Sequence, residues 1–156
     1  YRAESTAWRN AYLTGAYELR HGEPKRGVNL ASATELLNQT APEQFMQMFQ
    51  VALNGPDAED VTLTIRFNFR DVGEQYTVTV ENSVLTYRKG KAGKTPDASL
   101  TLTRPMLVKL VTKQVGIKEV LTSPDIKAGG STLDLIKFFS LLDKPDLVFP
   151  IVTPKA

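Results

Sequence analysis

The segment from residue 61 to residue 70 alternates without interruption between apolar and polar side chains. Successive side chains of a strand point to opposite faces of a sheet, so this period of two predicts a strand. The apolar side chains that share one face are Val61, Leu63, Ile65, Phe67 and Phe69. The pattern therefore predicts a sheet with one face in water and one apolar face that other elements must cover.

Shorter alternating segments follow this strand, and residues typical of turns separate them. The segments are residues 76–80, 84–88 and 98–102, and a last short strand is expected over 125–128. Turns are predicted at Asp71–Glu74 and at Glu81–Ser83. Because such short turns join neighbouring antiparallel strands, we expect a meander.

Helical patterns precede the strands. Apolar side chains at helical spacing predict a helix over residues 3–20, which Gly22 and Pro24 end. Two capping boxes, Ser32–Glu35 and Thr40–Glu43, each predict the start of a further helix before the sheet.

Helical patterns also follow the strands. Thr103 is expected to cap one helix, a short helix is expected over 116–121, and Ser131 is expected to cap a helix over 132–143. The order of helices, strands and helices predicts the α+β class, in which helices cover one face of an antiparallel sheet of about five strands.

Composition narrows the possible functions by exclusion. The 156 residues are 42% apolar and 23% charged, as expected for one soluble globular domain. A net charge of +2 does not indicate nucleic-acid binding, and no apolar stretch is long enough to span a membrane. With no cysteine and only His21, the chain cannot build a typical zinc centre alone. Motifs for a nucleophile elbow, a phosphate loop or a dinucleotide loop are absent, so we expect no catalytic residue, metal or cofactor in this chain.

Several segments resemble a known family. Residues 61–88, the strand Ala98–Leu102 and the run Pro124–Ser131 before an apolar helix resemble the sterol carrier protein fold, whose lipid carriers hold an apolar ligand between sheet and helices. The segment Trp8–Arg20 is similar to the end of the dimerisation domain of bacterial alkyl sulfatases, and Phe149–Pro154 is similar to the end of their C-terminal domain. Two further segments that fit the same family are Phe69–Tyr76 and Asn82–Gly90.

The resemblance implies a chain of three parts. Residues 1–22 would be the last helix of the dimerisation domain, 23–30 a linker, and 31–156 a sterol-carrier-like domain. In the parent enzyme, the resemblance implies a homodimer and a separate metallo-β-lactamase-like domain that cleaves the sulfate ester with two zinc ions. The His-x-His-x-Asp-His motif of that domain is missing here, so no metal ligand or catalytic residue is carried over. The chain begins with Tyr1, so we expect a processed chain or a piece of a longer protein, and the resemblance favours a periplasmic or secreted bacterial enzyme.

Large apolar residues of the predicted helices and strands are candidates for lining an apolar ligand cavity. They are Phe45, Met48, Phe49, Phe67, Phe69, Met106, Leu110, Phe138 and Leu142. Methionine and phenylalanine repack around variable alkyl chains more readily than β-branched residues do, which favours a cavity. Apolar stripes usually pack against each other, which favours a filled core, so both interpretations remain open.

Two other groups are candidates for contacts. One group is the aromatic stripe Trp8, Tyr12 and Tyr17, which either forms a subunit contact or packs on the helices of this domain. The resemblance favours a contact with residues of the dimerisation domain or of a partner chain, since an exposed aromatic stripe is unusual on a monomer. The segment Gly129–Ser131 at a helix start either binds an anion or forms a tight turn with a serine cap, and the turn is favoured.

Charged residues give weaker signals. The basic residues of one loop are expected to be solvated rather than to bind anionic lipid, detergent or nucleic acid. They are Arg88, Lys89, Lys91 and Lys94. His21 near a helix end is expected to interact favourably with the helix dipole rather than to bind metal.

These observations favour a binding domain over an enzyme. The preferred hypothesis is an accessory domain that shelters the alkyl chain of a long-chain sulfate ester while a separate zinc domain hydrolyses the ester. A purely structural domain that stabilises a dimer with a filled core is the first alternative, and a free-standing lipid carrier is the second. An independent enzyme is least favoured, since this chain lacks the chemical groups.

Overall fold

The computed structural model describes residues 5–22, 34, 37–91, 93, 95–112, 114–116, 119, 126–143 and 152. The chain divides into two compact units. One unit comprises residues 1–29 and 145–156, and the other comprises residues 30–144. The sequence-based division instead treats residues 23–30 as a separate linker and assigns residues 145–156 to the sheet domain.

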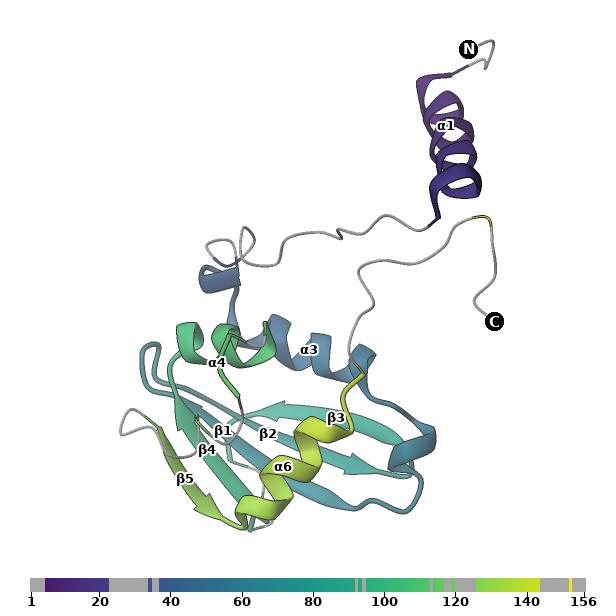
Figure 1. The fold of residues 1–156 in the computed structure, drawn as a ribbon. Coiled ribbons are helices and arrows are strands. Elements are labelled where there is room, and N and C mark those ends of the chain that lie inside the picture. Colours follow the sequence, from purple (N-terminus) through teal and green to yellow (C-terminus); the bar gives the residue numbers. More distant parts are fainter. Residues whose placement is uncertain are drawn as a thin grey trace. The chain divides into compact units, whose positions relative to one another are not determined.

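The larger unit contains a five-stranded sheet with the order β3-β2-β1-β4-β5 (Figure 1). Its strands are β1 (Leu63–Phe69), β2 (Glu74–Glu81), β3 (Val84–Lys89), β4 (Ala98–Leu102) and β5 (Lys127–Gly130). Neighbouring strands are antiparallel except for β1 and β4, which are parallel. The sheet is therefore mixed, and the prediction of an antiparallel meander is wrong beyond β3.

The pattern of side chains identified the strands but not their partners, because alternation is the same in parallel and antiparallel pairs. Since β3 lies at one edge and β4 pairs on the far side of β1, the connection from residue 90 to residue 97 must cross two strands. The resulting register places Ile65 opposite Ala98 and Phe69 opposite Leu102. Apolar side chains of β4 therefore join the apolar face of β1.

Helices α3 (Pro42–Ala52), α4 (Arg104–Val111) and α6 (Thr132–Ser140) cover one face of the sheet (Figure 1). The short 3-10 helix η1 (Pro56–Ala58) connects α3 to β1. Buried side chains of the helices and alternate side chains of the strands form one core. The predicted α+β class with helices on one face is confirmed.

The start of α3 lies one residue later than predicted. Its N-cap is Ala41 rather than Thr40, and the side chain of Gln44 accepts a hydrogen bond of 3.3 Å from the N–H of Ala41. Pro42 explains the shift, since proline is favoured at the first helical position and leaves the preceding residue outside the helix.

The other two helices of this unit differ in how they are capped. Thr103 precedes α4, but its side chain makes no capping bond. The carboxylate of Asp71 instead accepts hydrogen bonds of 3.3 Å from the N–H of Arg104. Ser131 caps α6 as predicted, because its hydroxyl accepts a hydrogen bond of 3.2 Å from the N–H of Asp134. Thr103 thus occupies the predicted N-cap position, but the capping bond comes from Asp71 in a turn distant in the sequence.

β5 begins later than predicted and includes both Gly129 and Gly130. A Cβ atom on Gly129 would lie 2.7 Å from Oγ of Ser99, and one on Gly130 would overlap the carbonyl oxygen of Asp97. Gly130 also has φ of 76°, a left-handed conformation that glycine adopts without strain. The close approach of β5 to β4 therefore requires glycine at these positions.

The smaller unit is built on helix α1 (Thr6–His21). Ser5 caps its start by accepting a hydrogen bond of 3.2 Å from the N–H of Trp8. Gly22 ends it in a positive-φ conformation, as predicted, and its N–H donates to the carbonyl of Glu18 at 2.7 Å.

One residue near the C-terminus packs on this helix. The N–H of Val152 donates a hydrogen bond of 3.1 Å to Oε1 of Glu18, which is buried. A Cβ atom on Gly15 would lie only 2.9 Å from Cγ2 of Val152. Gly15 therefore allows the chain at Val152 to lie close against α1.

Some predicted features lie outside the described residues. They include the Ser32–Glu35 capping box, the whole linker over 23–30, most of the helix over 116–121, and Lys94. Within the part of the chain that is described, no helix is both long enough and apolar enough to cross a membrane.

Candidate functional site

The alternating pattern of β1 becomes two different surfaces in the folded sheet. Ile65, Phe67 and Phe69 face the helices and are buried. They meet the buried residues of α3, α4 and α6, and together these side chains form an apolar layer between sheet and helices. This layer is the candidate site for an apolar ligand.

Four phenylalanine rings form the centre of this layer, and we call them the ring cluster: Phe49 of α3, Phe67 of β1, and Phe138 and Phe139 of α6. Ring centroids lie 5.8 Å apart in the pairs that join Phe49, Phe67 and Phe138 to one another. Phe139 lies 5.3 Å from Phe138 and 6.3 Å from the other two rings. Such separations are typical of favourable aromatic contacts.

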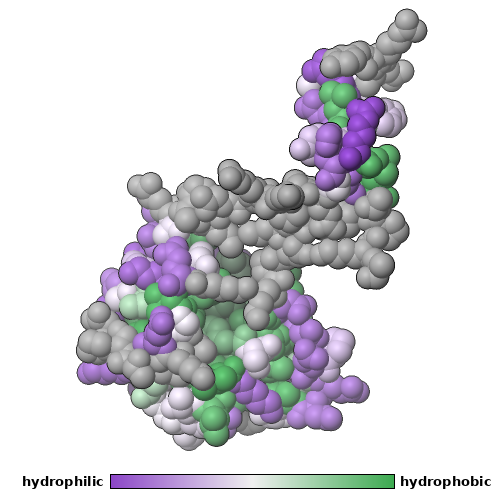
Figure 2. All heavy atoms as spheres, viewed as in Figure 1, coloured by the Kyte–Doolittle hydropathy of each residue, from purple (hydrophilic) through white to green (hydrophobic). Residues whose placement is uncertain are grey.

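The ring cluster has an exposed side. Phe139 is only partly buried, whereas the other three rings are buried. Other partly buried apolar residues, Met106 and Val111 of α4 and Leu142 after α6, also pack against the core. Figure 2 shows hydrophobic surface gathered in a recess between α4 and α6. The apolar layer is thus reached from outside along these two helices.

The structure brings most of the predicted ligand-lining residues together. Those buried in the layer are Phe45, Phe49, Phe67, Phe69, Leu110 and Phe138. Met106 and Leu142 lie partly buried against it. Met48 lies elsewhere, since its side chain is 47% exposed.

Met46 and Phe139 were absent from the predicted ligand-lining residues, as were Leu107, Val108 and Leu135. Met46 is fully buried on α3, because the inward stripe of this helix contains Pro42, Phe45, Met46 and Phe49. That stripe has the spacing i, i+3, i+4, i+7, which was available in the sequence as the signal for Met46. Phe139 was missed as a contact residue because it follows Phe138 directly and was read only as part of an apolar helix.

A short main-chain link holds α3 and α6 together at their ends. Leu53 and Leu142 form an isolated antiparallel bridge. The N–H of Asn54 donates to the carbonyl of Leu141 at 2.8 Å, and the N–H of Asp143 donates to the carbonyl of Ala52 at 2.6 Å. These bonds fix the two helices that carry three of the four rings.

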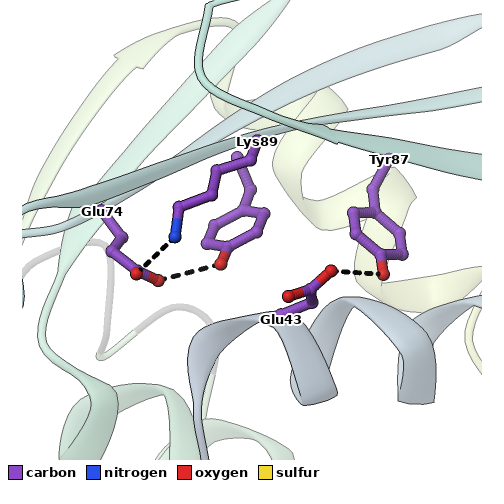
Figure 3. A network of polar contacts seen from close by, with 5 residues as sticks. Glu43, Glu74, Tyr87 and Lys89 are labelled. Carbon is purple, nitrogen blue, oxygen red and sulfur yellow. Dashed lines mark hydrogen bonds and ion pairs between the residues drawn. The ribbon is translucent and has the colours of Figure 1, made fainter.

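A polar network ties α3 to the edge strand β3 (Figure 3). The hydroxyl of Tyr87 donates a hydrogen bond of 3.2 Å to Glu43 and accepts one of 3.4 Å from Gln47. Gln50 adds a bond of 3.0 Å to the carbonyl of Leu85. Polar side chains on the outer side of α3 therefore hold its apolar side over the sheet.

A second polar group lies at the neighbouring end of β2. Glu74 accepts hydrogen bonds from the hydroxyl of Tyr76 at 2.8 Å and from Nζ of Lys89 at 2.6 Å (Figure 3). Burial of Tyr76 and its bond to Glu74 raise the pKa of the Tyr76 hydroxyl well above its usual range. The bonds from Lys89 and Tyr76 lower the pKa of Glu74. At neutral pH the tyrosine is thus a neutral donor and the glutamate an ionised acceptor.

The start of α4 is held by an ion pair. Nε of Arg104 donates to Oδ2 of Asp71 at 2.8 Å. Burial of Asp71 opposes ionisation, but hydrogen bonds from the side chain and backbone of Arg104 outweigh it, so the pKa of Asp71 lies below its usual value. The carboxylate also carries negative charge to the N-terminus of α4, where the helix dipole favours it.

The remaining candidates do not assemble into a chemical site. Gly129 and Gly130 belong to β5, and the cap of Ser131 matches the predicted turn. His21 stacks on Tyr17 with ring centroids 4.5 Å apart in α1. Among the residues described, no group of three or more His, Cys, Asp or Glu side chains is placed to hold a metal ion.

Comparisons with known proteins identify a matching family and close relatives. Residues 30–154 match the model of the alkyl sulfatase C-terminal family. The chain is 36% identical over 154 residues to a linear primary-alkylsulfatase of Pseudomonas sp., covering 99% of this chain and 23% of that protein. It is 34% identical over 155 residues to an alkyl/aryl-sulfatase of Saccharomyces cerevisiae, with the same two shares. The chain thus spans about a quarter of the length of these curated relatives.

Solved structures show the same relationship. The structure of the stereoselective inverting sec-alkylsulfatase of Pseudomonas sp. matches 97% of this chain and 24% of its own, at 30% identity and a TM-score of 0.80. The palmitated sterol carrier protein 2-like 2 of Aedes aegypti matches 65% of this chain and 95% of its own, at 16% identity and a TM-score of 0.51. The second match shows similarity of fold, and this fold is the one that the sequence resemblance predicted.

Proposed function

Because the chain belongs to the alkyl sulfatase C-terminal family, we propose that its sheet domain binds the alkyl chain of a sulfate ester. The ligand would lie between the sheet and the helices, at the ring cluster. Hydrolysis of the ester would take place in another part of a larger enzyme. No step of hydrolysis is assigned to this chain, since its described residues offer no site for a zinc ion.

The observation that carries this proposal is the partly exposed side of the ring cluster. Phe139 contacts all three buried rings and is itself only partly buried. Hydrophobic surface also lies in the recess between α4 and α6 in Figure 2. An alkyl chain that entered there would exchange water for aromatic and aliphatic contacts, at about 0.8 kcal/mol per methylene.

The layer also combines fixed and adaptable parts. Main-chain bonds hold α3 to α6, whereas Met46 within the core and Met106 packed against it supply unbranched side chains. Methionine adapts to ligands of different shape, so chains of different length can be accommodated without a change in the sheet. The relatives are named for primary, secondary and aryl sulfate esters, which is consistent with an adaptable apolar site.

Native mass spectrometry of the chain with dodecyl sulfate or dodecanol, below the micelle concentration, tests the proposal. We expect a discrete one-to-one adduct. The variant Phe139→Gln should weaken it roughly tenfold, because a partly buried ring contributes about 1.5 kcal/mol or more of apolar contact. Leu133→Gln is the matched control, since Leu133 lies on the same helix and is 76% exposed. If the wild-type chain forms no adduct, the result would instead support a purely structural domain. The same conclusion would follow if both variants weakened ligand binding equally.

A separate observation favours a subunit contact through α1. Trp8, Tyr12 and Tyr17 are 60%, 66% and 57% exposed, and Leu13 and Leu19 of the same helix are exposed as well. We propose that these side chains pack against a second copy of the chain, because isolated aromatic surface of this size is characteristic of interfaces. Sedimentation velocity should show a dimer that the double change Trp8→Ala and Tyr12→Ala dissociates, while Arg9→Ala leaves it intact. A wild-type chain that stays monomeric at high concentration would refute this contact.

A further inference from the structure

The face of the sheet that the helices leave uncovered carries a polar pocket. Its volume is about 350 Å³. The described residues that line it are Thr64, Thr77, Thr79, Thr86, Tyr87, Arg88 and Gly93. No acidic residue is among them, and the apolar-ligand proposal does not involve this face. The pocket therefore calls for its own explanation.

The strand register explains why hydroxyl groups converge here. Thr64 of β1 lies opposite Thr79 of β2, and Thr79 lies opposite Thr86 of β3. Residues directly opposite each other in antiparallel pairs point to the same face, so these three threonines form one row across the sheet. The next row contains Arg88 opposite Thr77. Arg66 of β1 is the third member of this row, because Thr77 of β2 lies between Arg66 and Arg88.

The connection between β3 and β4 bounds the pocket. The hydroxyl of Thr77 donates to the carbonyl of Gly90 at 2.9 Å. At the other end of the connection, the N–H of Asp97 donates to the carbonyl of Thr64 at 2.9 Å, and the carboxylate of Asp97 accepts from the N–H of Thr64 at 2.7 Å. Gly93 lies between these anchors and lines the pocket. The described part of this connection is thus anchored to the sheet at both ends.

Arg66 supplies the second observation that points to a ligand. Its Nε atom is buried and has no hydrogen-bond partner among the described residues. A buried donor that lacks a partner is uncommon, and a charged one is especially unfavourable. The hydroxyl of Thr79 makes no hydrogen bond within the described part of the chain, so it is also available to a ligand. Arg66 is not among the described residues that line the pocket, but it lies opposite Thr77, which does line it. An acceptor bound beside Thr77 would therefore give the Nε atom of Arg66 a partner.

We infer that this pocket binds a small oxyanion, a sulfate or phosphate group, either free or at the end of a monoester. Guanidinium groups match the geometry of such oxygens, and threonine hydroxyls donate further hydrogen bonds. Arg66 and Arg88 would supply the charge from opposite sides of Thr77, and Thr79 a neutral donor. The site lies on the face of the sheet opposite the ring cluster, so alkyl-chain binding and oxyanion binding are separate properties.

Titration of the chain with sodium sulfate, inorganic phosphate and ethyl sulfate, followed by backbone amide chemical shifts, tests this inference. Sodium chloride at matched ionic strength controls for screening. We expect saturable shifts at Thr77, Thr79 and the residues from Gly90 to Asp97 with at least one oxyanion. A stronger response to ethyl sulfate would identify an ester headgroup as the ligand, and an equal response would identify the free ion. Shifts no larger than those with chloride would overturn the inference.

Variants locate the binding to these side chains. Arg66→Gln should weaken oxyanion binding about tenfold, since a hydrogen bond from a charged donor is lost. Thr79→Val and Arg88→Gln should weaken it severalfold, and neither is expected to disturb folding, because valine suits a strand and Arg88 is exposed. Lys109→Gln removes the same charge from α4 and should leave binding unchanged. Unaltered affinity in both Thr79→Val and Arg88→Gln would contradict the assignment even if Arg66→Gln failed to fold.

Discussion

The two faces of the sheet share the same strands but have opposite properties. On the helix side, Phe67 and Phe69 are buried, and Phe67 lies within a cluster of rings. On the other side, Thr79 and Arg88 line a polar pocket together with Gly93 of the connection between β3 and β4. The comparison shows how a period of two lets one strand support an apolar layer and a polar surface at the same time. Stability should therefore depend mainly on one face, and polar recognition on the other.

Removing a ring from the apolar face should produce the largest loss of stability. Phe67→Ala deletes a fully buried side chain that contacts Phe49, Phe138 and Phe139, so we expect the free energy of unfolding to fall by about 3–5 kcal/mol. Thr79→Ala on the opposite face should cost less than about 1 kcal/mol. Urea denaturation of both variants measures the two losses in the free energy of unfolding. Equal losses would show that both faces of the sheet contribute equally to stability.

A smaller but still substantial loss is expected where β5 joins the sheet. Gly130→Ala would place a Cβ against the carbonyl oxygen of Asp97 and force alanine into a positive-φ conformation, at a cost of roughly 2 kcal/mol or more. Gly73→Ala is the matched control, since Gly73 also has positive φ but no atom near its Cβ position. Its cost should be about 1 kcal/mol. Thermal unfolding that ranks the two variants in the reverse order would contradict the role of close strand contact.

The ion pair at the start of α4 should contribute less and should depend on pH. Asp71→Ala removes the cap of Arg104, so we expect a loss of about 1 kcal/mol at neutral pH. The folded-state pKa of Asp71 lies below its usual value of 3.8, so its stabilising effect is present above that pH. The effect is lost as the pH falls through the folded pKa. Denaturation curves of wild type and variant should therefore converge in acid, and a constant difference would exclude this carboxylate as the cause.

The smallest effect is expected from the polar network on the outer side of α3. Tyr87→Phe removes the hydroxyl that bonds Glu43 and Gln47 but keeps the ring, and it should cost about 0.5–1 kcal/mol. A loss as large as that of Phe67→Ala would show that the network, rather than the ring cluster, holds α3 in place. Chemical denaturation at neutral pH gives the comparison.

Local patterns in the sequence were sufficient for the class of the fold. The alternation at residues 61–70 identified β1 and its buried face, and Ser131 and Gly22 were identified as helix caps from their local patterns. These features depend on residues close in the chain. The family resemblance supplied the sterol-carrier-like arrangement, which the pattern alone does not specify.

Features that depend on contacts between residues distant in the chain could not be predicted from local sequence patterns. The parallel pairing of β1 with β4 arises from a connection that crosses the sheet, and the cap of α4 comes from Asp71, which precedes it by more than thirty residues in the chain. Met48 was assigned to the apolar layer because it shares a helical stripe with Phe45 and Phe49, but α3 turns the neighbouring stripe, which contains Met46, toward the sheet. The polar pocket was also missed, because the positions of threonines across a sheet become apparent only once the strand register is known.

The central claim is that the apolar side of the sheet binds an alkyl chain. Isothermal titration calorimetry of the chain with alkyl sulfates of eight to fourteen carbons, below their micelle concentrations, tests it most directly. The account predicts that affinity rises with every added methylene, by up to about fourfold each, and that Phe139→Gln reduces this gain. An affinity that stays flat across the series would contradict the claim and would leave the ring cluster as a filled structural core.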